Sequence, residues 1–307
     1  MSETFELTRR MPDLPSTHLL GGGTAMCAGC GGLQALHQIY DVMGGKTVIV
    51  NAAGCMTLLS VYPFTPFRGS WLYTAMASAP AGAQGVRDAL DILREKGRLA
   101  PEDDLGVVTL TGDGAAYGMG LSATSAAIDR GLDFLYLCYD NEGYGNTGQQ
   151  TSPATPHAAH TATATGAAGH AGFKKDLFGL WVANRPAYAA TVLGSEPLDL
   201  ARKIEKATQL EGPRLILALA PCPTGWDFDP AAASEVGRLA WRTGFFPLKE
   251  YLDGRVVHTK VPRPRAPVEE YLKLQGRFRH LFEPERQQGL IDAIQARVDD
   301  YWEHAQS

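Results

Sequence analysis

The sequence has no run of Lys and Arg residues, and no apolar stretch in its 307 residues approaches the length of a membrane span. Nucleic-acid binding draws on clustered positive charge, so this absence and the net charge of −5 argue against nucleic acid as the main partner. The N-terminal residues also lack the apolar core of a signal peptide. We therefore expect a cytoplasmic protein that binds neither nucleic acids nor membranes.

Internal repeats are absent too, and the composition of 45% hydrophobic and 20% charged residues is typical of a packed globular chain. The length suits one large α/β domain or two modest ones. We predict an N-terminal arm over residues 1–20, where two prolines discourage a helix. The main domain is predicted over residues 21–245, followed by a C-terminal hairpin and helical extension over residues 246–307.

Cysteine is scarce. The chain has five, and an odd number in an intracellular protein fits metal ligation plus one spare thiol better than a disulfide framework. Four of them lie in loops where strands should end: Cys27, Cys30, Cys55 and Cys222. A Cys-x-x-Cys turn brings two sulfurs to one side, and two distant cysteines can complete a four-thiolate set, whose metal the spacing leaves open. The fifth, Cys138, falls within a predicted strand and is expected to be a buried, inert thiol.

Polar turns follow two predicted strands. The strand over residues 107–111 runs into Gly112-Asp113-Gly114, and the strand over residues 134–139 runs into a segment that contains Asn141. Asn141 lies 28 residues after Asp113, which suits one turn, one crossover helix and one strand of a βαβ unit. Both turns should therefore share one sheet edge, where a carboxylate, an amide oxygen and a backbone carbonyl can hold a hard cation beside a diphosphate.

Hydrophobic periodicity predicts the remaining elements. It indicates helices near residues 33–43, 81–94, 174–184 and 197–209, strands over residues 47–50, 188–193 and 214–219, a hairpin turn at Asp253-Gly254 and a helical tail from Val268. The expected fold class is α/β, with a mostly parallel open sheet and helices on both faces. Parallel pairing would gather Cys55, the Gly112 turn, the Asn141 segment and Cys222 at one carboxyl edge. The segment 143–172 is too long for a connector and is expected to wrap a ligand or a neighbouring subunit.

At these motifs the sequence resembles the thiamine-diphosphate-binding β subunits of the 2-oxoacid:ferredoxin oxidoreductases, most closely the pyruvate synthase type. The likeness runs from Cys27 to about Leu281 and includes C-x-x-C-G, N-A-x-G-C, G-D-G, D-N-E-x-Y-x-N-T-G, A-P-C-P-T-G-W and E-E-Y-L-K-L-Q-G-R-F-R-H. It implies coenzyme A-dependent oxidative decarboxylation of a 2-oxoacid, with pyruvate favoured, to acyl-CoA and CO2. It also makes residues 21–245 the thiamine-diphosphate and iron–sulfur binding domain.

The resemblance implies roles for individual residues. The matched cysteines would hold a [4Fe-4S] cluster: Cys27, Cys30, Cys55 and Cys222. Mg²⁺ would be held by Asp113, Asn141 and the main-chain carbonyl of Gly143. Further contacts to thiamine diphosphate would come from Gly112, Gly114, Tyr144, Asn146 and Cys55. Asn146 matches a residue near the reactive ring of the cofactor and is the expected catalytic residue.

The resemblance also implies partners. The glutamate that activates the cofactor comes from another subunit or domain in this family, so the chain alone should be inactive and an α subunit should supply that group. The chain lacks the paired Cys-x-x-Cys-x-x-Cys runs of a ferredoxin-like domain, so γ and ferredoxin-like δ subunits or their equivalents would carry further clusters. Electrons would pass to ferredoxin, or to NAD through an added flavin subunit.

Several alternatives stay open. The residues after Trp71 are Leu-Tyr-Thr-Ala, where pyruvate-type members commonly have an aromatic-acidic-Asn stretch, so phenylglyoxylate, oxalate or a branched 2-oxoacid are alternative substrates. A zinc-stabilised scaffold and a thiamine carboligase that transfers no electrons are alternative functions. Three histidines are expected to be polar loop lining, and three basic residues to be solvated surface charge: His157, His160, His170, Arg68, Lys174 and Lys175.

Overall fold

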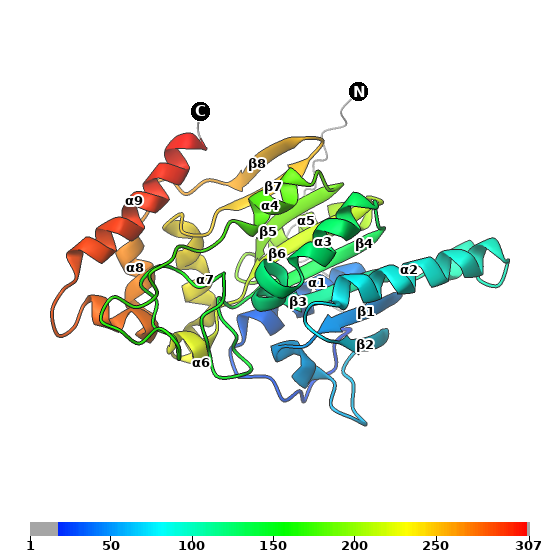
Figure 1. Ribbon diagram of the computed structural model, residues 1–307, viewed down its shortest axis with the longest axis horizontal. Coiled ribbons are helices and arrows are strands. Elements are labelled where there is room, and N and C mark those ends of the chain that lie inside the picture. The colour runs from blue at the N-terminus through cyan, green and yellow to red at the C-terminus, as the bar shows by residue number, and fades with distance from the viewer. Residues whose placement is uncertain (1–17, 306–307) are drawn as a thin grey trace.

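The structure is a computed structural model that describes residues 18–305 (Figure 1). Only the last three residues of the predicted arm over 1–20 fall within this range, so the arm lies otherwise outside the described residues. Among the described residues, no helix combines the length and the apolar character that a membrane span requires.

The described residues form one eight-stranded sheet, with the strand order β2-β1-β3-β4-β6-β5-β7-β8. The first six strands in this order are parallel, whereas β7 pairs antiparallel with β5, and β8 pairs antiparallel with β7. The strands are β1 (Thr47–Ala52), β2 (Ser70–Thr74), β3 (Gly106–Gly112), β4 (Phe134–Asp140), β5 (Tyr188–Leu193), β6 (Pro213–Leu219), β7 (Leu248–Leu252) and β8 (Arg255–Lys260). The predicted α/β class with a mostly parallel sheet is confirmed.

Helices cover both faces of the sheet (Figure 1). Alternate residues of β4 show why, because Phe134, Tyr136 and Cys138 enter one hydrophobic core and the residues between them enter the other. One core also contains buried residues of α1 and α5, and the other those of α2, α3, α4, α7, α8 and α9. The helices are α1 (Gly31–Met43), α2 (Ala79–Glu95), α3 (Leu121–Asp129), α4 (Leu177–Ala183), α5 (Pro197–Thr208), α6 (Pro223–Trp226), α7 (Ala233–Arg242), α8 (Val268–Lys273) and α9 (Gln288–His304).

Most predicted elements occur within a few residues of their expected bounds, and the hairpin turns at Asp253-Gly254 as expected. The helix predicted over residues 174–184 was placed too early. It begins at Leu177, because the side chain of Asp176 accepts a hydrogen bond from the Gly179 N–H at 2.9 Å and caps the helix. The edge strand β2 was not predicted, because it is largely exposed and shows no apolar alternation. Helices α6 and α7 were not predicted either.

The C-terminal hairpin extends the main sheet. Its first strand, β7, pairs with β5 through Ala189↔Tyr251 and Ala190↔Glu250. Helix α9 then packs into the same core as α4 and α7, with Ile291, Ile294 and Val298 buried. The division of the chain near residue 245 stays a prediction.

We expect Arg87→Ala to lower the free energy of unfolding by about 2–4 kcal/mol, because this buried guanidinium holds two carboxylates. Arg87 on α2 donates to Asp91 at 3.0 Å and to Asp104 at 2.9 Å, with its side chain only 6% exposed. Arg94 also contacts Asp104 but is 44% exposed, so Arg94→Ala is the matched control and should cost less than about 1 kcal/mol. Denaturant unfolding measures both, and equal losses would contradict the assignment.

Candidate active site

Four strand ends meet at one edge of the sheet. Strands β1, β3, β4 and β6 are parallel neighbours, and each leads into a residue singled out in the sequence. Cys55 follows β1, Asp113 follows β3, Asn141 follows β4 and Cys222 follows β6. The predicted convergence of these residues at one carboxyl edge is therefore what the topology produces.

The four loop cysteines lie within electrostatic reach of one another. The pKa of Cys55 is raised to about 12, mainly by burial and then, in decreasing order, by the charges of Cys222, Cys30, Asp113 and Cys27. Burial raises the pKa of Cys30 as well, with further contributions from Cys222 and Cys27. Thiolates packed so closely repel one another unless a cationic centre binds them.

Backbone N–H groups point at two of these sulfurs. Cys30 caps the start of α1, and its Sγ accepts a hydrogen bond from the Leu33 N–H at 3.4 Å. The Gly225 N–H donates to the Sγ of Cys222 at 3.3 Å. The two loops are joined directly, because the Gly31 N–H donates to the Pro221 carbonyl at 2.9 Å. A Cβ on Gly31 would lie 2.6 Å from Pro221, so this approach requires glycine.

The sulfurs are not arranged for one metal ion. Within residues 18–305, no group of three or more His, Cys, Asp or Glu side chains could hold a single ion.

Three oxygens converge beside Cys55. In one orientation of the Asn141 amide, its oxygen lies 2.7 Å from Asp113 Oδ1 and 3.3 Å from the Gly143 carbonyl, and its nitrogen lies 3.9 Å from Cys55 Sγ. In the other orientation the amide nitrogen donates to both oxygens. Adjacent ligands of an octahedral Mg²⁺ are about 2.9 Å apart, so the first orientation has the spacing of a cation site.

Asp113 is almost fully buried, and its environment suits a bound cation. Burial raises the pKa of Asp113 well above its usual range, and the nearby charge of Asp140 raises it further. The Ser152 hydroxyl donates a short hydrogen bond to Asp113 Oδ2, which leaves Oδ1 facing Asn141. A cation at this position would favour the charged carboxylate.

A buried charge network holds the segment that contains Asn141. Glu142 is fully buried with a positive φ of 60°, and its carboxylate accepts from Lys174 at 2.8 Å and from Arg277 at 2.6 Å. Burial would raise the pKa of Glu142, but these two cations outweigh it and lower the pKa. Lys174 also lies 2.5 Å from Asp140, to which the Tyr117 hydroxyl donates at 2.5 Å.

The expectation that Lys174 is solvated surface charge is wrong. Its side chain is 21% exposed and its ammonium lies between two buried carboxylates, which raise the pKa of Lys174 against the opposing effect of burial. Arg277 was not singled out in the sequence. Its guanidinium stacks 3.9 Å from the centre of the Trp226 ring, and that indole donates to the Asn141 carbonyl at 2.9 Å. Only its place in the C-terminal family motif could have drawn attention to Arg277.

The remaining predicted residues lie around this centre. The Tyr144 ring covers Gly114, where a Cβ would come within 2.1 Å of it, so only glycine fits there. Asn146 lies on the exposed part of the same loop. Gly112 ends β3 with Tyr139 packed against it, since a Cβ there would lie 3.1 Å from that ring. Cys138 is fully buried, as expected, and burial raises its pKa well above its usual range.

The histidines of the segment 143–172 make local contacts. His157 stacks on Phe173 with ring centres 4.5 Å apart, and His160 stacks on His280 at 3.6 Å. Burial lowers the pKa of His170. Lys175 and Arg68 are exposed, although Lys175 donates to the Tyr117 carbonyl.

The sequence is similar to those of known proteins over most of its length. Residues 52–218 match the profile of the family described as "Thiamine pyrophosphate enzyme, C-terminal TPP binding domain". "Pyruvate synthase subunit PorB" of Methanocaldococcus jannaschii is 39% identical over 290 residues, which is 93% of this chain and 96% of that protein. "Ketoisovalerate oxidoreductase subunit VorB" of Pyrococcus horikoshii is 36% identical over 308 residues, covering 98% and 96% of the two chains.

A solved structure shares the fold. A chain of the 2-oxoglutarate:ferredoxin oxidoreductase from Magnetococcus marinus superposes with a TM-score of 0.56 at 22% identity, covering 75% of this chain and 82% of that one. The solved structure shows the same fold, and the sequence relatives are named as oxidoreductase subunits. The chain belongs to the family of thiamine-diphosphate-binding β subunits of the 2-oxoacid:ferredoxin oxidoreductases.

Proposed function

We propose that this oxidoreductase subunit catalyses coenzyme A-dependent oxidative decarboxylation of a 2-oxoacid, with pyruvate as the favoured substrate. The observation that carries the proposal is the position of Asn141, whose amide lies between the oxygens of Asp113 and Gly143 on one side and the sulfur of Cys55 on the other. One residue thus joins a candidate cation site to a candidate redox centre. Relatives named as pyruvate synthase subunits support pyruvate.

Asp113, Asn141 and the Gly143 carbonyl would hold Mg²⁺, which offsets the charge of a diphosphate. The two separations from the Asn141 amide oxygen, 2.7 Å to Asp113 Oδ1 and 3.3 Å to the Gly143 carbonyl, support this proposal. When bound, thiamine diphosphate supplies an electron sink for decarboxylation. Residues of this chain would bind and orient it at the carboxyl edge of the sheet: Gly112, Gly114, Tyr144 and Asn146. Asn146 is the candidate for a catalytic contact.

We further propose that Cys27, Cys30, Cys55 and Cys222 ligate a [4Fe-4S] cluster. The mutual electrostatic effects of the thiols support it. Hydrogen bonds from backbone N–H groups to cluster sulfurs are one means by which proteins tune the reduction potential, and the N–H groups of Leu33 and Gly225 are in place. Cys27 is exposed, which would give electrons an exit to a partner.

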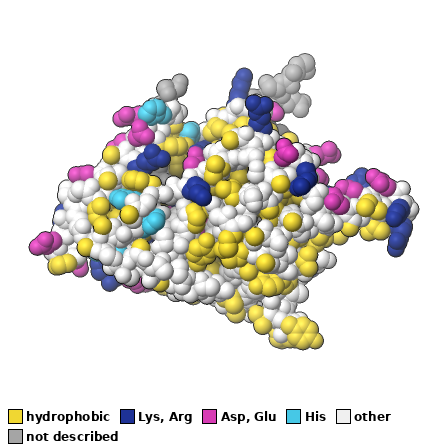
Figure 2. All heavy atoms as spheres, in the orientation of Figure 1, with side chains coloured by type: hydrophobic (Ala, Val, Ile, Leu, Met, Phe, Trp, Pro, Cys, Tyr) yellow, Lys and Arg dark blue, Asp and Glu magenta, His cyan; other side chains and the backbone are white. Residues whose placement is uncertain are grey.

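The chain is proposed to act with an α subunit that supplies the activating glutamate, and with γ and ferredoxin-like δ subunits or equivalents. Two features support a multi-subunit enzyme. The relatives are named as subunits, and the surface around β2 exposes apolar side chains. The edge strand β2 and the segment before it expose Val61, Tyr62, Phe64, Leu72 and Tyr73. Figure 2 shows hydrophobic side chains gathered at that end of the molecule. Ferredoxin, or an NAD-linked acceptor, would receive the electrons.

A branched 2-oxoacid is the second candidate substrate. Ketoisovalerate oxidoreductase subunits match this chain at 36% identity over nearly its full length, close to the 39–41% of several pyruvate synthase subunits.

We expect the purified complex to reduce a viologen dye with pyruvate and coenzyme A faster than with 2-oxoisovalerate, phenylglyoxylate or oxalate. The measurement is the initial rate of dye reduction for each acid, and omission of coenzyme A is the control. A higher rate with a branched acid would transfer the assignment to the second candidate. Dye reduction by none of the acids would refute the proposed reaction.

We expect Cys55→Ala to remove about four iron atoms per β subunit and to lower the visible absorption near about 400 nm by their share, because one ligand of the cluster is lost. Iron analysis and anaerobic absorption spectroscopy of the whole complex measure this. The control is Cys138→Ala, which removes a buried thiol from β4 and should keep iron and absorption unchanged. Unchanged iron in Cys55→Ala would refute the cluster, and zinc in its place would support the scaffold alternative.

We expect Arg277→Met to weaken thiamine diphosphate binding by about tenfold or more, because the buried Glu142 carboxylate loses one of its two cations and the Asn141 loop loosens. The matched control is Arg279→Met, two residues away, whose side chain is 65% exposed and pairs with the exposed Asp227. Titration of the complex with the cofactor in the presence of Mg²⁺ measures both. Equal affinities in the two variants would contradict the role given to the network.

A further inference from the structure

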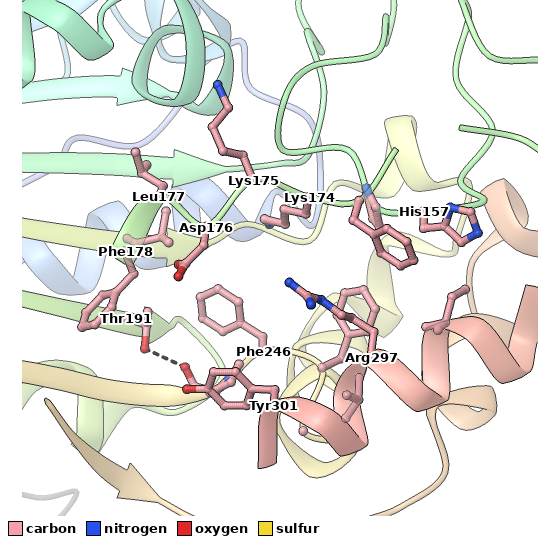
Figure 3. Close-up of a pocket in the computed structure, with 18 of the residues that line it drawn as sticks. His157, Lys174, Lys175, Asp176, Leu177, Phe178, Thr191, Phe246, Arg297 and Tyr301 are labelled. Carbon is pink, nitrogen blue, oxygen red and sulfur yellow. Dashed lines mark hydrogen bonds between the residues drawn. The ribbon is translucent and has the colours of Figure 1, made fainter. Parts of the chain in front are cut away.

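A cavity lies away from the candidate active site. It has a volume of about 230 Å³ and opens between α4, α9, the loop before β7 and the end of the segment 143–172 (Figure 3). Its walls are mainly apolar, with Leu177, Phe178, Phe246, Ile294 and Val298 among them. An apolar cavity of about 150 Å³ holds benzene, so this one has room for a larger organic group. None of the predicted cofactor or metal ligands lines it.

Among residues 18–305, one lysine of the cavity, Lys249, has no protein acceptor for its ammonium. The ammonium of Lys249, on β7, lies 4.6 Å from the centre of the Phe178 ring and 4.8 Å from that of Tyr301. Across residues 18–305, no hydrogen bond or ion pair joins this ammonium to an acceptor. Burial lowers the pKa of Lys249, and Asp176 opposes that effect only in part. A partly desolvated cation without an acceptor gains strongly from a bound anion.

Neighbouring lysines make the contrast clear. Lys203 and Lys206, on α5, pair with Asp199 and Glu250 at 2.6 Å each. Lys260, on β8, pairs with Glu196 and also lies over an aromatic ring, that of Trp241, at 4.5 Å. Lys260 therefore shows that a lysine beside an aromatic ring can also pair with a carboxylate, which the ammonium of Lys249 does not do among the described residues.

Arg297 is a second positively charged residue that lines the cavity. Arg297 projects from α9 into the space seen in Figure 3, with its guanidinium 5.9 Å from the centre of the Phe173 ring. Its nearest carboxylate is Asp300, at 3.9 Å on the exposed side of the helix. Of the described residues that line the cavity, Asp176 is the one acid, and its side chain caps α4.

We infer that this cavity binds a small amphipathic monocarboxylate. The apolar part of the ligand lies against Phe178, Phe246 and Val298, and its carboxylate accepts from Lys249, with Arg297 as a second positive group. Lys175 also lines the cavity, with its ammonium donating to the Tyr117 carbonyl. The mainly apolar walls favour one negative charge, because a phosphate group carries about two and would lose more hydration on entering the cavity. The cavity shares only the wall formed by Tyr117 and Lys174 with the network behind Asn141, so it is distinct from the thiamine diphosphate site.

The test uses isothermal titration calorimetry on the whole complex, with sodium octanoate as the ligand and 1-octanol as its neutral counterpart. Wild-type complex is expected to bind octanoate at least about tenfold more tightly than octanol. Lys249→Met should remove that preference by weakening octanoate binding about tenfold while leaving octanol binding unchanged. Lys260→Met is the control, since it removes an equivalent lysine outside the cavity and should change neither affinity.

A second variant tests the apolar half of the site from another element. Val298→Trp on α9 fills the cavity and should weaken both octanoate and octanol binding, while Lys249→Arg should retain the preference for octanoate. The inference is overturned if wild type shows no saturable octanoate binding in the millimolar range. It is also overturned if Lys249→Met and Val298→Trp both bind octanoate as wild type does, which would place that ligand elsewhere in the complex.

Discussion

The candidate active site depends on one buried carboxylate held between two cations. Glu142 is fully buried, and a charge in that position is stable only because Lys174 and Arg277 each bind one of its oxygens. The pairing also keeps Glu142 in a left-handed backbone conformation, which turns the chain between Asn141 and Gly143. That turn places the Gly143 carbonyl beside the Asn141 amide, which in turn lies beside Asp113.

The turn at Glu142 fixes Asn141 between the two candidate centres. The carbonyl of Asn141 is fixed by the Trp226 indole, and its side chain lies between the oxygens of the proposed Mg²⁺ site and the sulfur of Cys55. A cofactor anchored at the oxygens would therefore sit beside the proposed cluster. A one-electron relay requires a short separation between the electron source and its first acceptor, and in the proposed arrangement the parallel strand order would supply it.

Much of this arrangement was open to prediction because parallel strands impose a simple rule. Buried strands are recognisable as apolar runs, and the residues that follow them must share one edge when the strands are parallel. Cys55, Asp113, Asn141 and Cys222 are therefore brought together by local patterns plus one topological rule. The start of α4 was misplaced because a cap at Asp176 stops the helix from extending back, and β2 was missed because an exposed edge strand has no apolar alternation.

By itself, the sequence determined the α/β class, the order of most elements, the four converging loops and the family, because these depend on patterns within short segments. Only the tertiary structure decided how charges separated along the chain are paired. Arg277 meets Glu142 across 135 residues, and Lys174, which looked like surface charge, lies between two buried carboxylates. No local pattern encodes such a pairing, since it depends on which buried charges the packed elements leave facing one another.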